Sequence, residues 1–257
     1  MADEVLRERR GKVEILTINR PEARNAINGA VSAGLATALD ELADDPEVAV
    51  VVLTGSGDKA FSAGMDLKAF AAGEGGSIMG APGGFAGITT RVFPKPLIAA
   101  LNGSALAGGC EVMLSCDLVV AAEHAAIGIP EAKRGLIAGA GALIRLPKRL
   151  PAAVALELAL TGDPIDAHRA LELGLVNRVV PAERVLDEAL ELAERIAANA
   201  PLAIRYSKEL IKKAAEVPEE EGWKLNDAAV AVVFTSADAM EGPVAFAEKR
   251  APNWQGR

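Results

Sequence analysis

Apolar positions in the first 150 residues follow two different patterns. Short apolar runs that end at turn residues predict strands at 12–19, 48–53, 97–101 and 118–122. Apolar residues spaced three and four apart predict helices at 30–43 and 107–115. Strands and helices therefore mix in this part of the chain, as in an α/β core.

After about residue 150 the pattern becomes almost entirely helical. One short strand is predicted at 175–180, among helices at 152–160, 166–173, 183–198, 201–213, 219–234 and 238–249. We therefore expect a spiral α/β core followed by a helical C-terminal part, in preference to a regular doubly wound sheet. The glycine-rich segment 71–84 has no periodicity and predicts a mobile loop beside the site.

Composition and charge narrow the class of protein. The 257 residues are 51% apolar and 4% aromatic, which indicates one large or two small globular domains with an aliphatic core. A net charge of −8 argues against a general nucleic-acid or anionic-membrane binder, although a local basic pocket stays open. Segment 1–12 has no apolar core, and no apolar run approaches the roughly 18 residues of a membrane span. We expect neither a signal peptide nor a transmembrane helix, and a cytoplasmic protein.

Several common kinds of site are missing from the sequence. Cys110 and Cys116 lie in one apolar stretch without zinc or CxxC spacing, which predicts reduced core cysteines. His124 and His168 form no HxxxH or HxH pair, which excludes a histidine-rich metal site but not a carboxylate site. The chain also lacks a P-loop, a GxSxG nucleophile elbow and a GxGxxG pattern.

Candidate chemistry begins with a glycine pair at the start of a predicted helix. Gly108 and Gly109 open that helix, so its free N–H groups suit a developing negative charge. Glu111 is the only charged residue between Lys95 and Asp117, and such apolar surroundings should raise its pKa. Proton transfer is one role for Glu111, and stabilisation of the helix dipole is the alternative.

Two further segments have weaker signals of their own. The stretch FSAGMDL at 61–67 follows a predicted strand, and by itself indicates an ordinary tight turn. Glu131 follows Pro130 and precedes a glycine-rich run at 135–141 that permits close approach of a ligand. A surface glutamate paired with Lys133 or Arg134 is the alternative to a catalytic Glu131.

Taken in order, these segments resemble the crotonase, or enoyl-CoA hydratase/isomerase, superfamily almost from end to end. The stretch NRPEARNA at 19–26 is similar to the family's N-terminal motif, and FAEKRAPN at 246–253 to its C-terminal signature. The resemblance implies a crotonase (ClpP/crotonase-like) spiral of ββα units. It further implies a core with the acyl-CoA site over 1–195 and a helical part over 196–257 that assembles homotrimers or dimers of trimers.

The resemblance also implies roles for individual residues. The backbone N–H groups of Met65 and Gly108 match the family's oxyanion hole, and Glu111 and Glu131 match the two glutamates that hold the reacting water in hydratases. Having both glutamates favours hydration of a trans-2-enoyl-CoA to a 3-hydroxyacyl-CoA. A Δ3,Δ2-enoyl-CoA isomerase or another CoA lyase of the superfamily is the alternative, followed by a non-catalytic CoA-binding scaffold.

Substrate contacts are expected near the same motifs. In an acidic protein the CoA phosphates need local cations, for which Arg24 and Lys249 are candidates. Ala63, Asp66 and Leu67, around the FxAG glycine, are the further candidates for substrate binding. Coenzyme A is part of the substrate, and no metal or redox cofactor is expected.

The chain departs from the pattern of well-matched hydratases at a few positions. Ala107 stands where glycine is usual, Met65 where alanine is frequent, and AGAGA at 138–142 where PGAGG is usual. We expect these departures to affect the choice of acyl chain more than the reaction.

Overall fold

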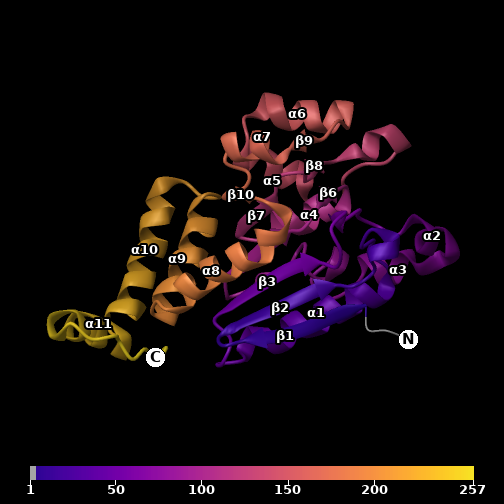
Figure 1. Ribbon diagram of the computed structural model, residues 1–257. Helices are drawn as coiled ribbons and strands as arrows, with labels where there is room; N and C mark the ends of the chain where they lie inside the picture. Colours follow the sequence, from indigo (N-terminus) through magenta and orange to yellow (C-terminus); the bar gives the residue numbers. More distant parts are fainter. Residues whose placement is uncertain (1–3) are drawn as a thin grey trace.

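The computed structural model describes residues 4–257, and within them two β-sheets form the centre of the molecule (Figure 1). Residues 1–3, which begin the segment where no signal peptide is expected, lie outside the described part. The first sheet contains, in spatial order, β1 (Val5–Arg10), β2 (Val13–Ile18), β3 (Val50–Gly55), β5 (Leu97–Leu101), β7 (Leu118–Ala122) and β10 (Arg178–Val180). The second contains β4 (Ala60–Ser62), β6 (Ser104–Leu106), β8 (Ala126–Gly128) and β9 (Ile165–Asp166).

From β3 to β8 the strands alternate between the two sheets along the chain. β3 leads to β4, β5 to β6 and β7 to β8, and each pair is followed by a helical segment, namely α2 (Leu67–Ala69), α4 (Gly108–Ser115) and η4 (Pro130–Arg134). β3, β5 and β7 are parallel neighbours in the first sheet, and β4, β6 and β8 in the second. Each repeat therefore advances both sheets by one strand, which confirms the predicted spiral of ββα units.

Burial explains why some strands were readable from the sequence. Every residue of β3 and β5 is buried, as expected for parallel strands covered on both faces. Helix α8 (Val185–Ala197) packs against β3, β5 and β7 through its apolar side. Other helices of the body are α1 (Gly29–Asp44), α5 (Ala142–Arg149), α6 (Ala152–Thr161) and α7 (Ala167–Glu172). Asn28 caps α1 by accepting a hydrogen bond from Val31 N.

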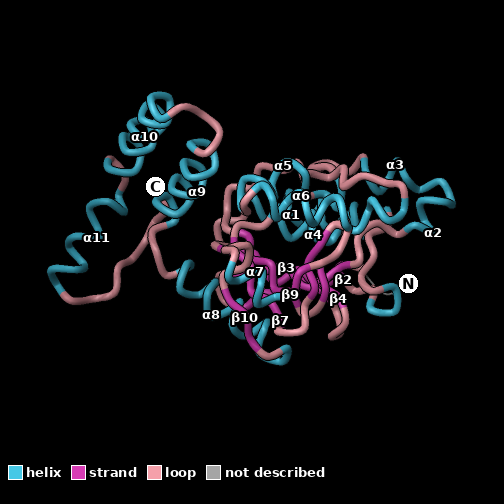
Figure 2. Tube along the Cα trace, turned by 90° about the horizontal axis from the view of Figure 1, so that it is seen from above, coloured by secondary structure: helices cyan, strands magenta, loops and turns pink. Residues whose placement is uncertain are grey.

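The last three helices form an arm that projects from the body in both views (Figures 1 and 2). The arm consists of α9 (Pro201–Ala214), α10 (Glu219–Phe234) and α11 (Ala237–Glu248). Neither α9 nor α10 contains a buried residue, and an ion pair between Lys208 and Asp117 at 2.7 Å joins the arm to the core. The boundary predicted at 195–196 falls in the last turn of α8, and the arm begins after it.

No single helix in the part of the chain that the structure describes is long and apolar enough to cross a membrane. Helices α10 and α11 satisfy that test of length and composition only as a pair, and they meet at a bend of 66°.

Three local predictions differ from the structure. Segment 71–84 contains short helical turns, η2 (Phe70–Glu74) and α3 (Gly75–Met79), because Ile78 and the backbone near it pack onto α1. The strand predicted at 175–180 is shorter, because only its last three residues pair with β7. Strand β1 was not predicted, since its charged sequence gives no apolar signal and its order comes from antiparallel pairing with β2.

Candidate active site

Two glycine-containing turns meet at the start of α4. A Cβ atom built on Gly64 would lie 2.6 Å from the backbone N of Gly108, and one built on Gly108 would lie 2.6 Å from the ring of Phe85. Gly109 is as tightly enclosed, since its Cβ would lie 2.1 Å from the carbonyl O of Ser62. The backbone of the FSAGMDL turn and the first turn of α4 are therefore in direct contact.

The N–H of Met65 points away from Ile27, with which Met65 forms an isolated parallel β-bridge. Ile27 N donates to Gly64 O at 2.8 Å, and Asp66 N donates to Ile27 O at 2.9 Å. In such a parallel bridge the groups on either side of Met65 are used, so its own N–H points to the opposite side. Gly108 is the first residue of α4, where the N–H has no acceptor within the helix.

Glu111 is almost completely buried in the second half of the first turn of α4, at 3% exposure. Its Oε1 accepts hydrogen bonds from Ala140 N at 2.6 Å and Ala142 N at 3.1 Å. Burial raises the pKa of Glu111 above its ordinary value, although these N–H groups oppose the effect. The raised pKa is as predicted, and the carboxylate is held by a distant loop instead of capping its own helix.

Glu131 lies in η4 and is half-buried. Its Oε2 is inaccessible to solvent and has no hydrogen-bond donor among the described residues. Burial raises the pKa of Glu131, and the charge of Glu111 raises it further. Lys133 is paired with Asp163 and not with Glu131. The charge of Glu111 thus acts on Glu131, although 20 residues, spanning β7 and β8, separate the two in the sequence.

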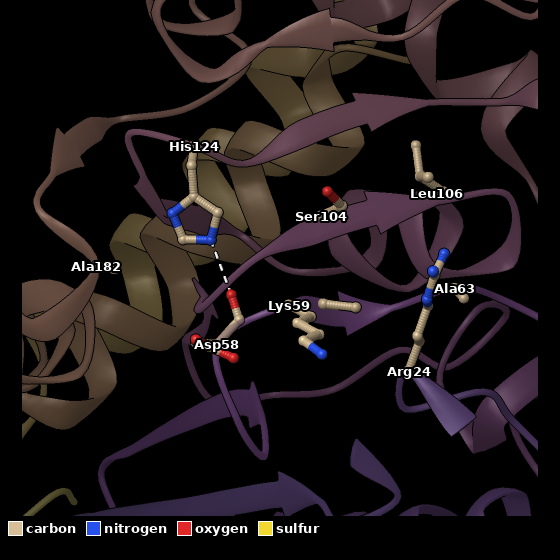
Figure 3. A pocket seen from close by; sticks show the side chains of 9 residues that line it. Arg24, Asp58, Lys59, Ala63, Ser104, Leu106, His124 and Ala182 are labelled. Atoms are coloured by element: carbon tan, nitrogen blue, oxygen red, sulfur yellow. Dashed lines mark hydrogen bonds between the residues drawn. The ribbon is translucent and has the colours of Figure 1, made fainter. Parts of the chain in front are cut away.

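A pocket of about 610 Å³ opens beside this region (Figure 3). Arg24, Lys59 and Ala63 are among its lining residues, and Arg24 O accepts a hydrogen bond from Ala63 N at 3.0 Å. His124 also lines it, and its Nε2 lies 2.8 Å from the carbonyl O of Asp58, which ties down the loop before Lys59. Two cations therefore stand at one pocket in a protein of net charge −8.

The N-terminal motif holds Arg24 in place through its neighbour. Asn25 is fully buried, and its Nδ2 donates to the carbonyl oxygens of Ser56 and Ala60. Both Arg24 and Asn25 have φ near +54°, in the left-handed region that asparagine tolerates well. This turn brings Arg24 to the pocket formed by the segment 58–63.

The remaining sequence candidates lie elsewhere. The carboxylate of Asp66 caps α2 by accepting from Lys68 N and Ala69 N, and it pairs with Arg20 at 2.9 Å. Burial opposes its ionisation, but these partners outweigh burial and lower the pKa of Asp66. Leu67 is 48% exposed, and neither residue lines the 610 Å³ pocket. Lys249 ends α11 on the arm, which both views place far from α4.

Sequence reasoning missed Lys59 and the loop that holds Glu111. Lys59 gives no signal of its own in the sequence, because only the fold shows that it lines the same pocket as Arg24. The glycines at 139 and 141 marked the loop, yet its contact with Glu111 depends on α5, which was not predicted. Pro147 inside that helix and the preceding glycines hide its pattern.

Comparison with known proteins agrees with this architecture. The enoyl-CoA hydratase/isomerase family matches residues 8–257. A carnitinyl-CoA dehydratase of Salmonella typhi is 44% identical over 263 residues, covering 100% of both chains. The structure of an enoyl-CoA hydratase from Mycobacterium tuberculosis H37Rv superimposes with a TM-score of 0.95 at 51% identity, covering 99% of this chain and 100% of that one. A carnitinyl-CoA hydratase from Mycobacterium avium gives 0.81 at 49% identity, covering 100% of both.

Fold, site and relatives together define an enzyme of the hydro-lyase type with hydratase-type activity. The chain belongs to the enoyl-CoA hydratase/isomerase family.

Proposed function

We propose that this enzyme adds water reversibly to a trans-2-enoyl-CoA and gives a 3-hydroxyacyl-CoA. The observation that carries the proposal is a pair of buried carboxyl groups with different partners. Glu111 Oε1 accepts hydrogen bonds from Ala140 N and Ala142 N, whereas Glu131 Oε2 is inaccessible to solvent and has no donor among the described residues. Burial raises the pKa of both glutamates. Such a pair accommodates one proton more readily than two negative charges, which makes one member a base and the other an acid.

The hydrogen bonds support one division of roles between the two glutamates. Two backbone N–H groups point at Glu111 Oε1 and favour its ionised form, so Glu111 is the base. Nothing in the described chain pairs with the buried Glu131 Oε2, which favours the protonated form, so Glu131 is the acid. Glu111 takes a proton from water as the water oxygen bonds to Cβ of the substrate. Glu131 then delivers its proton to Cα.

The backbone supplies the remaining stabilisation. As the water oxygen attacks, the π electrons of the alkene shift onto the thioester carbonyl and form an enolate. The N–H groups of Met65 and Gly108 are proposed to donate to that oxygen, and loss of one such donor typically lowers kcat about 10²–10³-fold. The addition of water oxidises and reduces nothing, and passage of the proton from Glu111 to Glu131 restores both carboxyl groups, so the proposed mechanism requires no metal or redox cofactor.

Coenzyme A is proposed to occupy the pocket beside this site. Arg24 and Lys59 are proposed to pair with its phosphates, and Ala63 lines the same pocket. Asp66 contributes by holding the turn that carries Met65, and Leu67 is the exposed first residue of α2. Within one chain Lys249 is remote from this pocket, so it contacts CoA only if the arm of one subunit reaches another.

The arm itself is proposed to form the subunit contact of a homotrimer or a dimer of trimers. It exposes large apolar side chains, among them Phe234 at 74%, Met240 at 71% and Phe246 at 87%. Such a surface marks an interaction site in a water-soluble protein. Light scattering at micromolar concentration should give a multiple of the 26.5 kDa chain, and a monomer would contradict this assignment. The two free thiols are consistent with the reducing cytoplasm proposed as its location.

One assay tests the reaction and separates it from its alternatives. Addition of the enzyme to crotonyl-CoA should remove the ultraviolet absorbance of the conjugated thioester, and mass spectrometry should show the gain of one water. A shifted double bond without added mass on a 3-enoyl-CoA would indicate an isomerase, and CoA binding without turnover a scaffold.

The acyl group is tested by a second substrate. Relatives named for carnitinyl-CoA make that thioester, whose acyl group carries a trimethylammonium group, the second candidate. Dehydration of carnitinyl-CoA with little turnover of 3-hydroxybutyryl-CoA would show that the enzyme carries out this reaction on the charged acyl group. The reverse preference would assign it to an apolar one.

A further inference from the structure

Arg145, on α5, links the two halves of the site. Its Nη2 donates to the carbonyl O of Thr89, and its Nη1 lies 3.4 Å from the carbonyl O of Ala140. The guanidinium also lies against Gly141, where a Cβ atom would be 2.4 Å from Nη1. One half-buried side chain therefore contacts two separate backbone segments.

The first of these segments holds Glu111. Arg145 contacts Ala140 O and the backbone of Gly141, while the N–H groups of Ala140 and Ala142 donate to Glu111 Oε1. A shift of this loop would carry both donors away from the carboxylate.

The second segment adjoins the proposed oxyanion donor. Thr89 is buried two residues after η3 (Phe85–Gly87), and the ring of Phe85 packs against Gly108. Arg145 therefore ties the loop at Glu111 to the segment that packs on Gly108.

Charge adds to geometry at this position. Among the elements packed against α4, strands β4 and β6 and helix η3 carry no charged side chain, whereas α5 carries Arg145, Lys148 and Arg149. Glu131 of η4 is the acidic neighbour of Glu111, and Arg145 is the cation that lowers the pKa of Glu111 against the effect of burial. Arg149 donates to Cys116 O, and Lys148 pairs with Glu216, so neither is directed at the carboxylate.

We propose that Arg145 is a positioning residue for Glu111. Arg145 holds residues 140–142, whose N–H groups donate to Glu111, in a fixed position relative to the segment 85–89 that packs on Gly108. The inference rests on the proposed function, in which Glu111 is the base that accepts the proton of water.

The test compares Arg145→Gln, Arg145→Lys and the charge-matched control Lys148→Gln. Arg145→Gln should lower kcat about tenfold to a hundredfold, because displacement of a reacting group by about 1 Å has that effect. Its KM should change little, since the cations at the CoA pocket are not involved. Arg145→Lys keeps the charge but not the two-sided fork, and should recover part of the lost kcat. Lys148→Gln should behave as the wild type.

A second readout does not depend on turnover. Infrared difference titration, with Glu111→Gln as the reference that identifies the band, reports protonation of Glu111 in the free enzyme. In Arg145→Gln this titration, and the acidic limb of the kcat profile, should move to higher pH than in the wild type. Arg145→Lys should lie closer to the wild type.

The two readouts distinguish failure of this inference from failure of the proposed function. A folded Arg145→Gln variant with the wild-type titration of Glu111 would overturn the inference, whatever the enzyme turns over. Wild-type enzyme that hydrates no enoyl-CoA would instead overturn the proposed function, and the titration would still decide whether Arg145 acts on Glu111.

Discussion

Replacement of Gly64 by alanine tests the proposed oxyanion hole without touching either donor residue. The new Cβ would lie 2.6 Å from Gly108 N, 3.0 Å from Ala107 Cβ and 3.1 Å from Leu106 O. Because ordinary contacts begin at 3.4 Å, the two backbone segments must separate by about 0.8 Å. Gly64 also has φ +87°, where an alanine is strained by about 1–3 kcal/mol. We expect kcat to fall about a hundredfold, because misplacement of this size has that effect on an aligned group.

The assay is hydration of crotonyl-CoA, with kcat and KM measured separately. KM should stay near the wild-type value, since the pocket around Arg24 is unchanged. Gly174→Ala is the matched control, because Gly174 has φ +75° and no atom within 4 Å of its Cβ position. It carries similar backbone strain without the contact and should keep kcat. If folded Gly64→Ala turned over at the wild-type rate, stabilisation of the enolate by the Gly108 N–H would be refuted.

Three further predictions concern the acids and the CoA pocket. Glu111→Gln and Glu131→Gln should each lower kcat about 10²–10⁴-fold while CoA binding by calorimetry is kept, and normal turnover in either would remove that residue's role. Because the pKa of Glu111 is raised on folding, its contribution to stability is present below the unfolded pKa of about 4.3 and is lost as pH rises through the folded pKa. Urea unfolding should therefore show Glu111→Gln gaining stability relative to wild type as pH rises, and a pH-independent difference would contradict this. Arg24→Ala and Lys59→Ala should each raise KM about tenfold without lowering kcat, with an effect that weakens in salt, and a salt-independent KM would argue against phosphate pairing.

The long elements could be predicted because their patterns depend on local sequence and on burial. The strand at Leu97–Leu101 was predicted with its bounds because its apolar run ends at a turn. Helix α10 was predicted with both ends although no side chain caps its N-terminus, because it directly follows Pro218. β4, β6, β8 and β9 could not be predicted, since strands of two or three residues are ordered by their partners and not by their own propensity. The same holds for β1, whose outward charges conceal its pairing with β2.

Some features of the candidate site could be predicted from the sequence and others could not. The burial of Glu111 and its raised pKa follow from an isolated acid in an apolar stretch, and both were confirmed. That Glu111 acts together with Glu131 was predicted from the family resemblance alone. β7 and β8 separate the two residues in the sequence, so their relation depends on how the ββα units stack. Lys59 and Arg145 could not be predicted, because their proposed roles depend on contacts between segments far apart in sequence.

The structure also explains why the acyl group is less predictable than the reaction. The proposed donors at Met65 and Gly108 are backbone groups, so their chemistry is largely independent of the side chain at 65. Glu111 is held by backbone groups as well, since its carboxylate accepts hydrogen bonds from the N–H groups of Ala140 and Ala142. Side chains around these backbone groups can therefore differ while the backbone geometry is kept. The relatives at 44% and 51% identity are named a carnitinyl-CoA dehydratase and an enoyl-CoA hydratase, respectively. We therefore expect acyl preference to depend on side chains near the proposed donors, Met65 among them, so that substitution of Met65 alters substrate choice before it alters rate.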